Sequence, residues 1–493
     1  MEIDRDRPEK TVFILQTGLT AYSTEWCASD FPEGDAMRSL EEFVQAKTGL
    51  SLFDRAIGPG DCVVIKPNLV RDWHPDGHDL YSVVTHPAII RAVVDGVYRA
   101  LHGEGQIIIA DAPMADTDFD HLLAATGLER IADYYWRRHR FEILIRDLRK
   151  YRYRVQQRPG GYGYEVRSPL PGDPKGYVEV DLGSQSAFNG LTDLHLLEGT
   201  DIARRKETIA SHSAGVNRYL IARTVLEADA IVGVPKLKTH SKVGITANCK
   251  GMVGINGDKN WLPHFRWGSP MQGGDQFPAR SIRSIDEKRF RLGLLVRDTL
   301  VARQTAWADA ILRIVQSASG TVAGLLGFQP VDPVNGDWPG NDTCWRLAAD
   351  LVRVAIFADK SGRLGTTPRR RFLSIVDGII GGEGEGPLRP TPKPCGVLLA
   401  GLHPVAVDMA CARLMGFDYH KIRYLHELCQ GAAAELQPGL GPLRPEEVRV
   451  FSNYQPWNEL NGLAQGRLLS FAPPARWAGH MEIAGGEIGG DLR

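Results

Sequence analysis

The sequence predicts an α/β protein with a mostly parallel, doubly wound sheet that has helices on both faces and is interrupted by two large insertions. Three observations support this fold class. Short β-branched runs alternate with segments of helical periodicity, polar or ionisable residues follow the strands where they end, and two long stretches break the alternation. A parallel sheet covered by helices on both faces produces such an alternation.

The alternation begins at Cys62 with the β-branched run "CVVIKPNLV". Pro87 then suits the first turn of a helix, where no backbone N–H group is needed. The predicted strand, helix, strand, helix and strand cover residues 62–70, 86–102, 105–113, 118–135 and 141–148. This βαβαβ order predicts parallel strands.

Two insertions interrupt the alternation of strands and helices beyond this series. Gly, Pro and Tyr predict loops and short antiparallel strands in the first interruption, and the second begins as a loop and becomes helical through about residue 327. The insertions cover residues 149–200 and 262–365. The other predicted elements are a helix over 216–229, a strand over 230–238 and a helix over 343–359. Strand, loop, strand and helix then follow over 371–387 and 395–417. The predicted organisation is an N-terminal strand and extension over 1–60, an α/β domain over 61–430 and an irregular tail over 431–493.

Composition limits the partners of the protein. The 493 residues include 58 Lys and Arg against 59 Asp and Glu, so the formal charge of -1 provides no global field for nucleic acid or an anionic membrane. The N-terminus "MEIDRDRPEK" is charged, and no long uncharged apolar run follows, which predicts a cytoplasmic protein without membrane insertion. The most apolar stretch, 310–328, contains Arg313 and predicts a buried or lid-forming helix. Seven scattered cysteines without a CxxC pair argue against an iron–sulfur cluster.

Polar residues converge where the predicted strands end. Ligands of doubly wound sheets bind outside the carboxyl ends of the strands, so these positions predict a site. The residues are Lys66, Asn68, Asp111, Lys236, Lys238, His240, Asp377, Glu383, Glu385 and His403.

The stretch "PKLKTHSK" places Lys236, Lys238, His240 and Lys242 at alternate positions, which lie on one face of an extended chain. Such a row repels itself unless an anion or protein carboxylates neutralise it. A substrate carboxylate or phosphate would do so, and the alternative is a solvated edge with lysines facing water.

The next stretch, "GITANCKGMVG", contains small residues that allow close backbone approach, and its Lys250 is a further candidate cation for the site. The GxxxxGK[ST] pattern is absent, which argues against a nucleotide triphosphatase. Cys249 is either a nucleophile with a lowered pKa or an inert buried thiol.

The stretch "DGIIGGEGEGP" has the opposite charge. Asp377, Glu383 and Glu385, joined by Asp111, are hard oxygen ligands suited to a divalent cation such as Mg²⁺. The alternatives are a flexible acidic loop, pairing with the lysine row, and, for Asp111, a helix N-cap. Two further stretches suit a lid over the site: His86 precedes a helix, and a Gly-rich loop offers His264 and Arg266 with nearby aromatic residues.

The motifs "VIKPNLV", "THPAIIRAVVDG", "ADAIVGVPKLKTHSKVGITANCKGMVGI", "DGIIGGEGEGP" and "HPVAVDMACARLMG", in this order, resemble the DUF362 family of prokaryotic proteins over roughly residues 60 to 430. The resemblance implies no assigned reaction. Many relatives carry a ferredoxin-like segment with clustered cysteines, which this chain lacks, and Gly251 stands where the family pattern commonly has asparagine.

These observations predict a cytoplasmic enzyme that acts on a small carboxylate or phosphate metabolite by Lys and His acid–base chemistry, with or without a metal ion. Isomerase or lyase chemistry is favoured over hydrolase or transferase chemistry, and the alternatives are a binding or cofactor-maturation protein and a redox accessory protein. The oligomeric state is left open. The candidate residues are His240, Lys238 and Lys250 for catalysis; Lys66, Asn68, His86, Lys236, Thr246, His264 and Arg266 for substrate binding; and Asp111, Asp377, Glu383 and Glu385 for metal binding.

Overall fold

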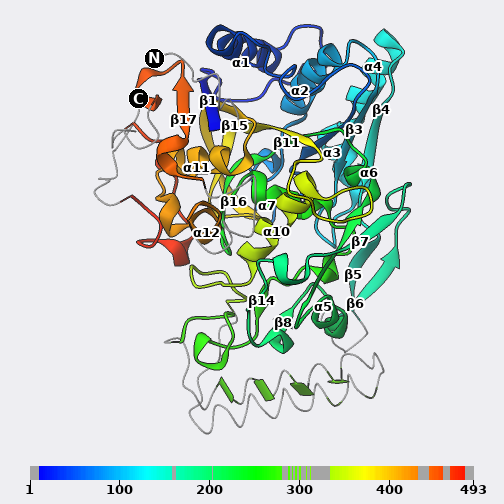
Figure 1. Ribbon diagram of the computed structural model, residues 1–493, viewed down its shortest axis with the longest axis vertical. Helices are drawn as coiled ribbons and strands as arrows, with labels where there is room; N and C mark the ends of the chain where they lie inside the picture. The colour runs from blue at the N-terminus through cyan, green and yellow to red at the C-terminus, as the bar shows by residue number, and fades with distance from the viewer. Residues whose placement is uncertain are drawn as a thin grey trace.

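The computed structural model contains a ten-stranded mixed sheet at its centre (Figure 1). It describes residues 10–157, 163–201, 204–279, short pieces between 287 and 311, 334–430, 443–458 and 467–483. The main path of the sheet is β17 (Arg449–Ser452), β1 (Thr11–Gln16), β16 (Arg389–Gly401), β15 (Arg371–Glu385), β11 (Ala230–Val234), β2 (Cys62–Pro67), β3 (Gln106–Asp111) and β4 (Ile143–Asp147).

Most neighbouring strands run parallel. Every pair from β15 through β11, β2 and β3 to β4 is parallel, and β16 is antiparallel to β15 and β1 on its two sides. The strands β12 (Lys236–His240) and β13 (Gly244–Thr246) extend the sheet beside β15. This architecture confirms the predicted α/β class with a mostly parallel sheet.

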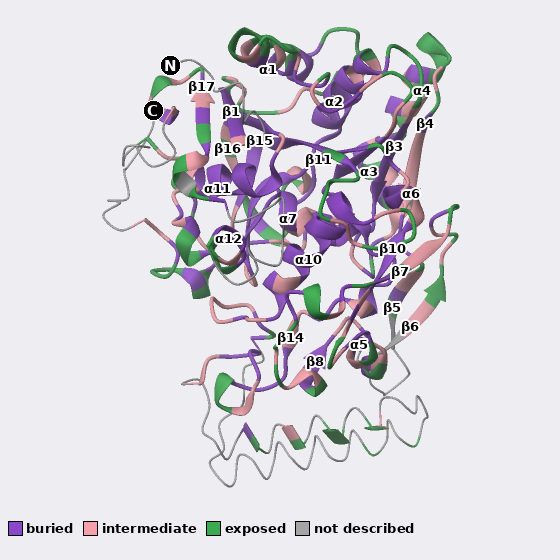
Figure 2. Ribbon diagram, in the orientation of Figure 1, coloured by how far each residue is buried: buried purple, intermediate pink, exposed green. Residues whose placement is uncertain are grey.

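Helices cover both faces because the strands alternate their apolar side chains. Ile107 and Ile109 belong to one core with α1 (Pro32–Thr48), α2 (Pro87–Ala100) and α4 (Glu129–His139). Ile108 belongs to the opposite core, with α10 (Cys344–Phe357) and α11 (Pro404–Met415). The central strands, α10 and α11 are accordingly buried in Figure 2, whereas α1 has a largely exposed outer side. Strands buried on both faces are continuously apolar, as the β-branched runs predicted.

The predicted helix over 118–135 consists of two helices. α3 (Phe119–Thr126) ends at Gly127, whose φ of +64° lies in the left-handed region, and α4 follows. Glycine adopts this conformation without a steric penalty and therefore ends the first helix. The remaining elements of the βαβαβ series match the prediction within a few residues.

The predicted helix over 216–229 is wrong for most of its length. Residues Val216–Ala222 form β10, and only α6 (Arg223–Leu226) is helical. β10 pairs antiparallel with β7 (Tyr177–Asp181), which comes from the first predicted insertion. Local periodicity could not reveal this partner, because strand formation depends on cross-strand contacts.

The glycine-rich acidic segment continues a strand where a loop was predicted. β15 runs unbroken to Glu385 and pairs with β16. A Cβ atom on Gly382 would lie 2.5 Å from the Ser82 carbonyl oxygen, and one on Gly386 would lie 2.0 Å from that of Thr239. The glycines therefore allow neighbouring backbone to approach closely, a use that composition alone does not separate from a flexible turn.

The two regions predicted as insertions differ in how much is described. The first contains the hairpin of β5 (Tyr151–Gln157) and β6 (Gly163–Pro169) together with β7. The second contains α10, which confirms the helix predicted over 343–359, whereas the apolar stretch 310–328 lies almost entirely outside the described residues. Among described helices, none has the length and apolarity needed to cross a membrane.

A buried carboxylate attaches α11 to the short helix α7 (Asn248–Gly251), which carries Lys250. Asp408 accepts hydrogen bonds from the backbone N–H groups of Asn248 and Cys249 at 2.8 and 3.0 Å and from the Tyr424 hydroxyl at 3.1 Å. Burial raises the pKa of Asp408, although the hydrogen bonds from Asn248 and Cys249 lower it. The carboxylate thus caps α7 from a neighbouring helix. It thereby fixes the position of the backbone from which the Lys250 side chain extends.

We expect Asp408→Asn to destabilise the protein by about 2 kcal/mol, because an amide group places N–H donors against the donors of α7. Tyr424→Phe removes one of the hydrogen bonds and should cost about 1 kcal/mol. Thermal and urea denaturation would measure both changes. Equal stability of Asp408→Asn and the wild type would show that the carboxylate does not hold α7.

Candidate functional site

A cavity of about 620 Å³ lies beyond the carboxyl ends of β2 and β3 and beside β12. Its walls also come from α7, from the loop around His264 and from the hairpin of β15 and β16. This position is where a doubly wound sheet binds its ligands. The charged or titratable residues that line the cavity are Lys66, Asp111, Lys238, His240, Lys242, Lys250, Lys259, His264, Asp337, Glu385 and Arg389.

The cavity brings together most of the residues that the sequence suggested. Those that line it are Lys66, Asn68, Asp111, Lys238, His240, Thr246, Lys250, His264 and Glu385. Those that lie elsewhere are His86, Lys236, Arg266, Asp377 and Glu383. Residues from β2, β3, β12, β13, β15, α7 and the loop around His264 therefore meet at one place.

Lys66 and Asp111 form a buried ion pair in the wall of the cavity. Their Nζ and Oδ1 atoms are 2.6 Å apart, and the side chains are 2% and 5% exposed. The other oxygen of Asp111 accepts the backbone N–H of Leu69 at 2.7 Å. Asp111 therefore neutralises a lysine and anchors the loop after β2.

Lys238 reaches the cavity with only neutral partners. Its Nζ atom donates to the carbonyl oxygens of Val83 at 2.7 Å and Pro387 at 2.9 Å. Burial lowers the pKa of Lys238 well below its ordinary value, and the positive charges of Lys236 and Lys250 lower it further. A buried lysine without a carboxylate loses its proton more easily than one in water.

Lys250 and Thr246 present polar atoms that lack partners among the described residues. Lys250 is half-buried on α7, forms no ion pair with a described residue, and has a pKa lowered by burial. The buried hydroxyl oxygen of Thr246 likewise has no hydrogen-bond partner in the described part of the chain. Both residues line the cavity, so a polar ligand there would satisfy them.

Sequence analysis missed Lys259, which begins the 3-10 turn η7 (Lys259–Trp261). Its Nζ atom donates to the carbonyl oxygen of Ala112 at 2.5 Å inside the cavity. Burial lowers the pKa of Lys259 to about 7, with Lys66 among the cations that add to this effect and Asp111 opposing it. The only sequence signal was a lysine close behind the glycine-rich motif.

Two histidines line the cavity, and their Nδ1 atoms meet backbone groups. His240 Nδ1 accepts the N–H of Lys242 at 3.1 Å, whereas His264 Nδ1 lies 2.8 Å from the carbonyl oxygen of Leu262. Burial and nearby lysines lower the pKa of both imidazoles, that of His264 to about 3. Burial and the neighbouring lysines therefore favour the neutral form of both rings.

Lys236 belongs to a second buried cluster beside the cavity. Its Nζ atom lies 2.9 Å from Asp377 Oδ2 and 2.5 Å from the hydroxyl of Tyr22. Asp377 also accepts the backbone N–H of His86 at 3.0 Å, and the His86 ring stacks on Tyr22 with centroids 3.9 Å apart. Asp377 is thus the counter-charge of a lysine, which was one of the alternatives for the acidic motif.

The other acidic candidates also have protein partners. Glu383 pairs with Lys393 at 2.8 Å, and Glu385 accepts the backbone N–H of Ala475 at 2.7 Å. Within the described residues, no group of three or more His, Cys, Asp or Glu side chains is arranged to hold a metal ion. Arg266 lies 3.5 Å from Asp342 and 3.7 Å from Asp275, away from the cavity lining.

Cys249 is the inert alternative. Burial and the nearby carboxylate of Asp408 raise the pKa of its thiol well above the ordinary value. The thiolate that a nucleophile requires is therefore disfavoured.

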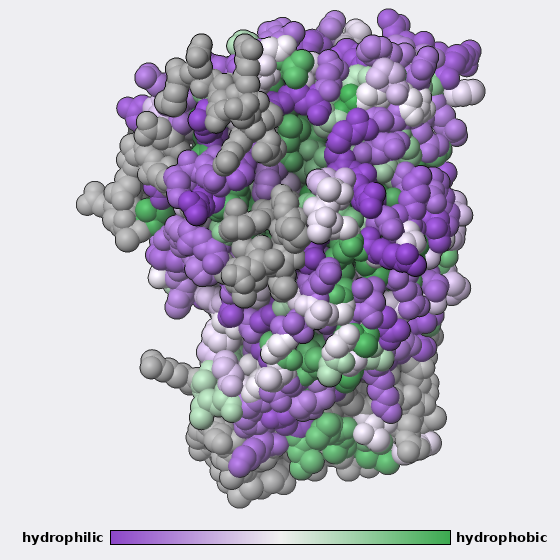
Figure 3. All heavy atoms as spheres, viewed as in Figure 1, coloured by the Kyte–Doolittle hydropathy of each residue, from purple (hydrophilic) through white to green (hydrophobic). Residues whose placement is uncertain are grey.

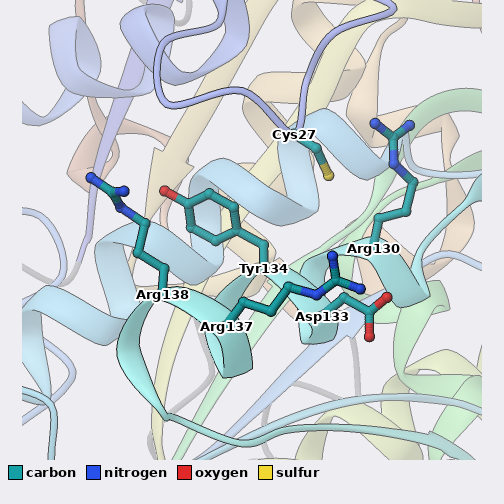
Figure 4. Close-up of a pocket in the computed structure, with 6 residues that line it drawn as sticks. All are labelled: Cys27, Arg130, Asp133, Tyr134, Arg137 and Arg138. Atoms are coloured by element: carbon teal, nitrogen blue, oxygen red, sulfur yellow. The ribbon is translucent and has the colours of Figure 1, made fainter.

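A second hollow of about 640 Å³ lies along α4 (Figure 4). Arg130, Arg137 and Arg138 project from the exposed side of the helix, and Cys27 approaches from a neighbouring loop. Hydrophilic residues also cover much of the face of the molecule in Figure 3. Exposed arginines are solvated by water, so this hollow creates no comparable need for a ligand.

A family model described as "Domain of unknown function (DUF362)" matches residues 63–142 and 184–413. Neither the curated proteins nor the solved structures contain a match to the chain. The matched segments include β2, β3, β12 and α7, which build most of the cavity.

Gly254 lies directly against the Lys66–Asp111 ion pair and leaves no room for a side chain. A Cβ atom at this position would lie 2.0 Å from Asp111 Oδ1 and 2.6 Å from Lys66 Nζ. We expect Gly254→Ala to displace the ion pair and lower stability by about 3 kcal/mol or more, as breaking a buried pair does. Thermal denaturation would measure the loss.

Gly251 provides the matched control, because a Cβ atom there meets nothing within 4 Å and its backbone is helical. Gly251→Ala should leave stability unchanged or raise it by up to about 1 kcal/mol. Equal effects of the two substitutions would contradict the close contact at Gly254.

Proposed function

The chain belongs to the DUF362 family, a domain of unknown function. Because the family name assigns no reaction, we propose a function from the residues that line the cavity. The protein is a cytoplasmic enzyme that binds a small carboxylate or phosphate metabolite and moves a proton on it with Lys and His side chains. Isomerisation and elimination are the favoured reaction classes.

One observation carries the proposal: three lysine ammonium groups face the cavity without a carboxylate partner among the described residues. They belong to Lys238, Lys250 and Lys259. The other cations of the lining are paired, Lys66 with Asp111, Lys242 with Asp337 at 3.0 Å, and Arg389 with Asp76 at 2.6 Å. The balance of charge therefore favours an anionic ligand.

The energetics support an anion rather than a neutral ligand. Burying an ammonium group without a counter-charge costs several kcal/mol, which the lowered pKa values of the three lysines reflect. An anion among them would remove this cost and raise their pKa values. Its binding would be correspondingly strong for so small a ligand.

The cationic cavity also suits the chemistry of proton abstraction. A C–H bond beside a carboxylate or carbonyl group is weakly acidic, and its removal places negative charge on oxygen as an enolate. Ammonium groups fixed around that oxygen stabilise this charge in the transition state. A neutral imidazole in the same cavity can accept the proton. The acidic candidates hold lysines or backbone N–H groups, which supports acid–base chemistry over metal-assisted hydrolysis.

Calorimetric titration with phosphate, sulfate and malonate would test the proposal. We expect binding of at least one of these anions, and a rise in thermal denaturation temperature that increases with anion concentration. The absence of both effects for all three anions would overturn the function. Binding without any turnover of small hydroxy or oxo acids would favour the alternative of a purely binding protein.

Lys250 should contribute directly to anion affinity. Lys250→Gln removes a charge that has no described counter-ion, so we expect the dissociation constant for the bound anion to rise about tenfold or more. Lys175→Gln is the matched control, because Lys175 pairs with Glu227 at the surface and lies outside the cavity. A loss of affinity shared by both variants would indicate a non-specific effect of charge.

Anion affinity should depend on pH through Lys259. Its pKa of about 7 means that the ammonium form dominates below neutrality and the amine form above it. Because an anion binds the ammonium form better, affinity should fall from about pH 6 to about pH 8, and Lys259→Met should flatten this dependence. Calorimetry with sulfate, which does not titrate in this range, would measure it. Affinity that rises with pH would contradict the assignment.

A further inference from the structure

The two histidines of the cavity are bonded to backbone groups of opposite character. His240 faces an N–H group and His264 faces a carbonyl group, and in both rings the contact is made by Nδ1. A backbone N–H can only donate and a carbonyl oxygen can only accept. These contacts therefore fix the position of the proton on each neutral ring.

In His240 the proton lies on Nε2. Nδ1 accepts the Lys242 N–H at 3.1 Å and must carry a lone pair, so the neutral ring bears its hydrogen on the other nitrogen. Protonating Nδ1 would place two donors against each other and break this bond. His240 is thus a hydrogen-bond donor at Nε2 and a poor proton acceptor.

In His264 the proton lies on Nδ1. This atom donates to the Leu262 carbonyl oxygen at 2.8 Å, which leaves a lone pair on Nε2. A proton added to Nε2 leaves the bond to Leu262 intact. His264 is thus able to gain a proton without losing any described contact.

We infer that the two histidines divide the proton chemistry of the cavity, with Nε2 of His264 accepting a proton from the bound anion and Nε2–H of His240 donating a hydrogen bond to its charged oxygen. This inference rests on the proposed function, and it assigns the role of base to His264, which the sequence predicted as a substrate-binding residue, and not to the predicted catalytic residue His240. It also makes the substrate an anion that has a C–H bond next to a carbonyl or carboxylate carbon.

The step is balanced in atoms and electrons. The C–H bond breaks and its proton forms a new N–H bond at His264 Nε2. The electron pair of the C–H bond becomes the C=C bond of an enolate, and the negative charge resides on the oxygen that His240 contacts. Return of the proton to a neighbouring carbon completes an isomerisation, whereas loss of a leaving group from that carbon completes an elimination.

The charges around the rings are consistent with these roles. Lys242, Lys250 and Lys259 act on His264, and Lys238, Lys242 and Lys250 act on His240. These cations favour the neutral form of both rings until an anion offsets them. An anion should therefore raise the pKa of His264, which can take up the proton, more than that of His240.

Nuclear magnetic resonance of ¹⁵N-histidine-labelled wild-type protein tests the inference directly. Long-range correlations between ring protons and ring nitrogens show which nitrogen carries the hydrogen. We expect the hydrogen on Nε2 of His240 and on Nδ1 of His264, and with saturating sulfate a larger rise in the pKa of His264. The reverse tautomers, the same tautomer in both rings, or a larger shift for His240 would each overturn the inference.

Asparagine provides matched variants for assignment and for binding. The amide of Asn can reproduce the contact of Nδ1 with the backbone while removing Nε2 from either ring. His240→Asn should weaken sulfate binding about tenfold because it removes a donor to the anion, whereas His264→Asn should change it less than about twofold at pH 8. Equal losses, or a larger loss for His264→Asn, would overturn the division of roles.

The experiment separates the two levels of the argument. Failure of sulfate, phosphate and malonate to bind the wild-type protein overturns the proposed function. Anion binding combined with wrong tautomers overturns only the roles assigned to the histidines. A circular dichroism spectrum equal to that of the wild type ensures that each Asn variant is folded.

Discussion

The cost of burying positive charge governs the structure around the cavity. Six lysines converge there or directly beside it, and each ammonium group must be neutralised, hydrogen-bonded or deprotonated. The protein treats them differently. Lys66, Lys236 and Lys242 receive carboxylates, whereas Lys238, Lys250 and Lys259 have none among the described residues. The first group supports the architecture, and the second is the basis of the proposed anion binding.

Close backbone packing positions the lysines of both groups. Gly254 allows the Lys66 pair to press against the turn that follows α7, and Asp408 caps α7 so that Lys250 faces the cavity. The glycines of β15 let this strand approach β12 and the turn that contains Ser82. Such contacts leave little room for movement, so the lysine side chains are held in place. In the proposed reaction, charges positioned in advance in this way would stabilise the transition state without reorganisation.

Sequence predicted the parts of this protein that follow from local patterns. Continuous β-branched runs predicted the parallel strands, and the rule about strand ends placed Lys66, Asp111 and Lys238 at one site. Features that depend on distant partners were not predictable in this way. β10 is a strand because β7 pairs with it, and the proton on each histidine is set by a backbone group that only the folded chain brings into contact. Lys259 escaped notice because its low pKa arises from burial rather than from spacing.

The alternation of Lys236 and Lys238 shows why a shared face does not imply a shared role. β12 advances two residues between them, yet their partners on β15, Asp377 and Gly382, are five residues apart, so the register shifts between the two lysines. Lys236 therefore meets a carboxylate deep in the sheet and Lys238 reaches the cavity.

The charge of the cavity lining would depend on whether an anion is bound. Burial lowers the pKa values of Lys238, Lys259 and His264, and an anion in the cavity would raise them, so the proposed anion binding would be thermodynamically linked to protonation. An anion among these groups would favour their charged forms, and we expect His264 to accept a proton most readily when the anion is in place.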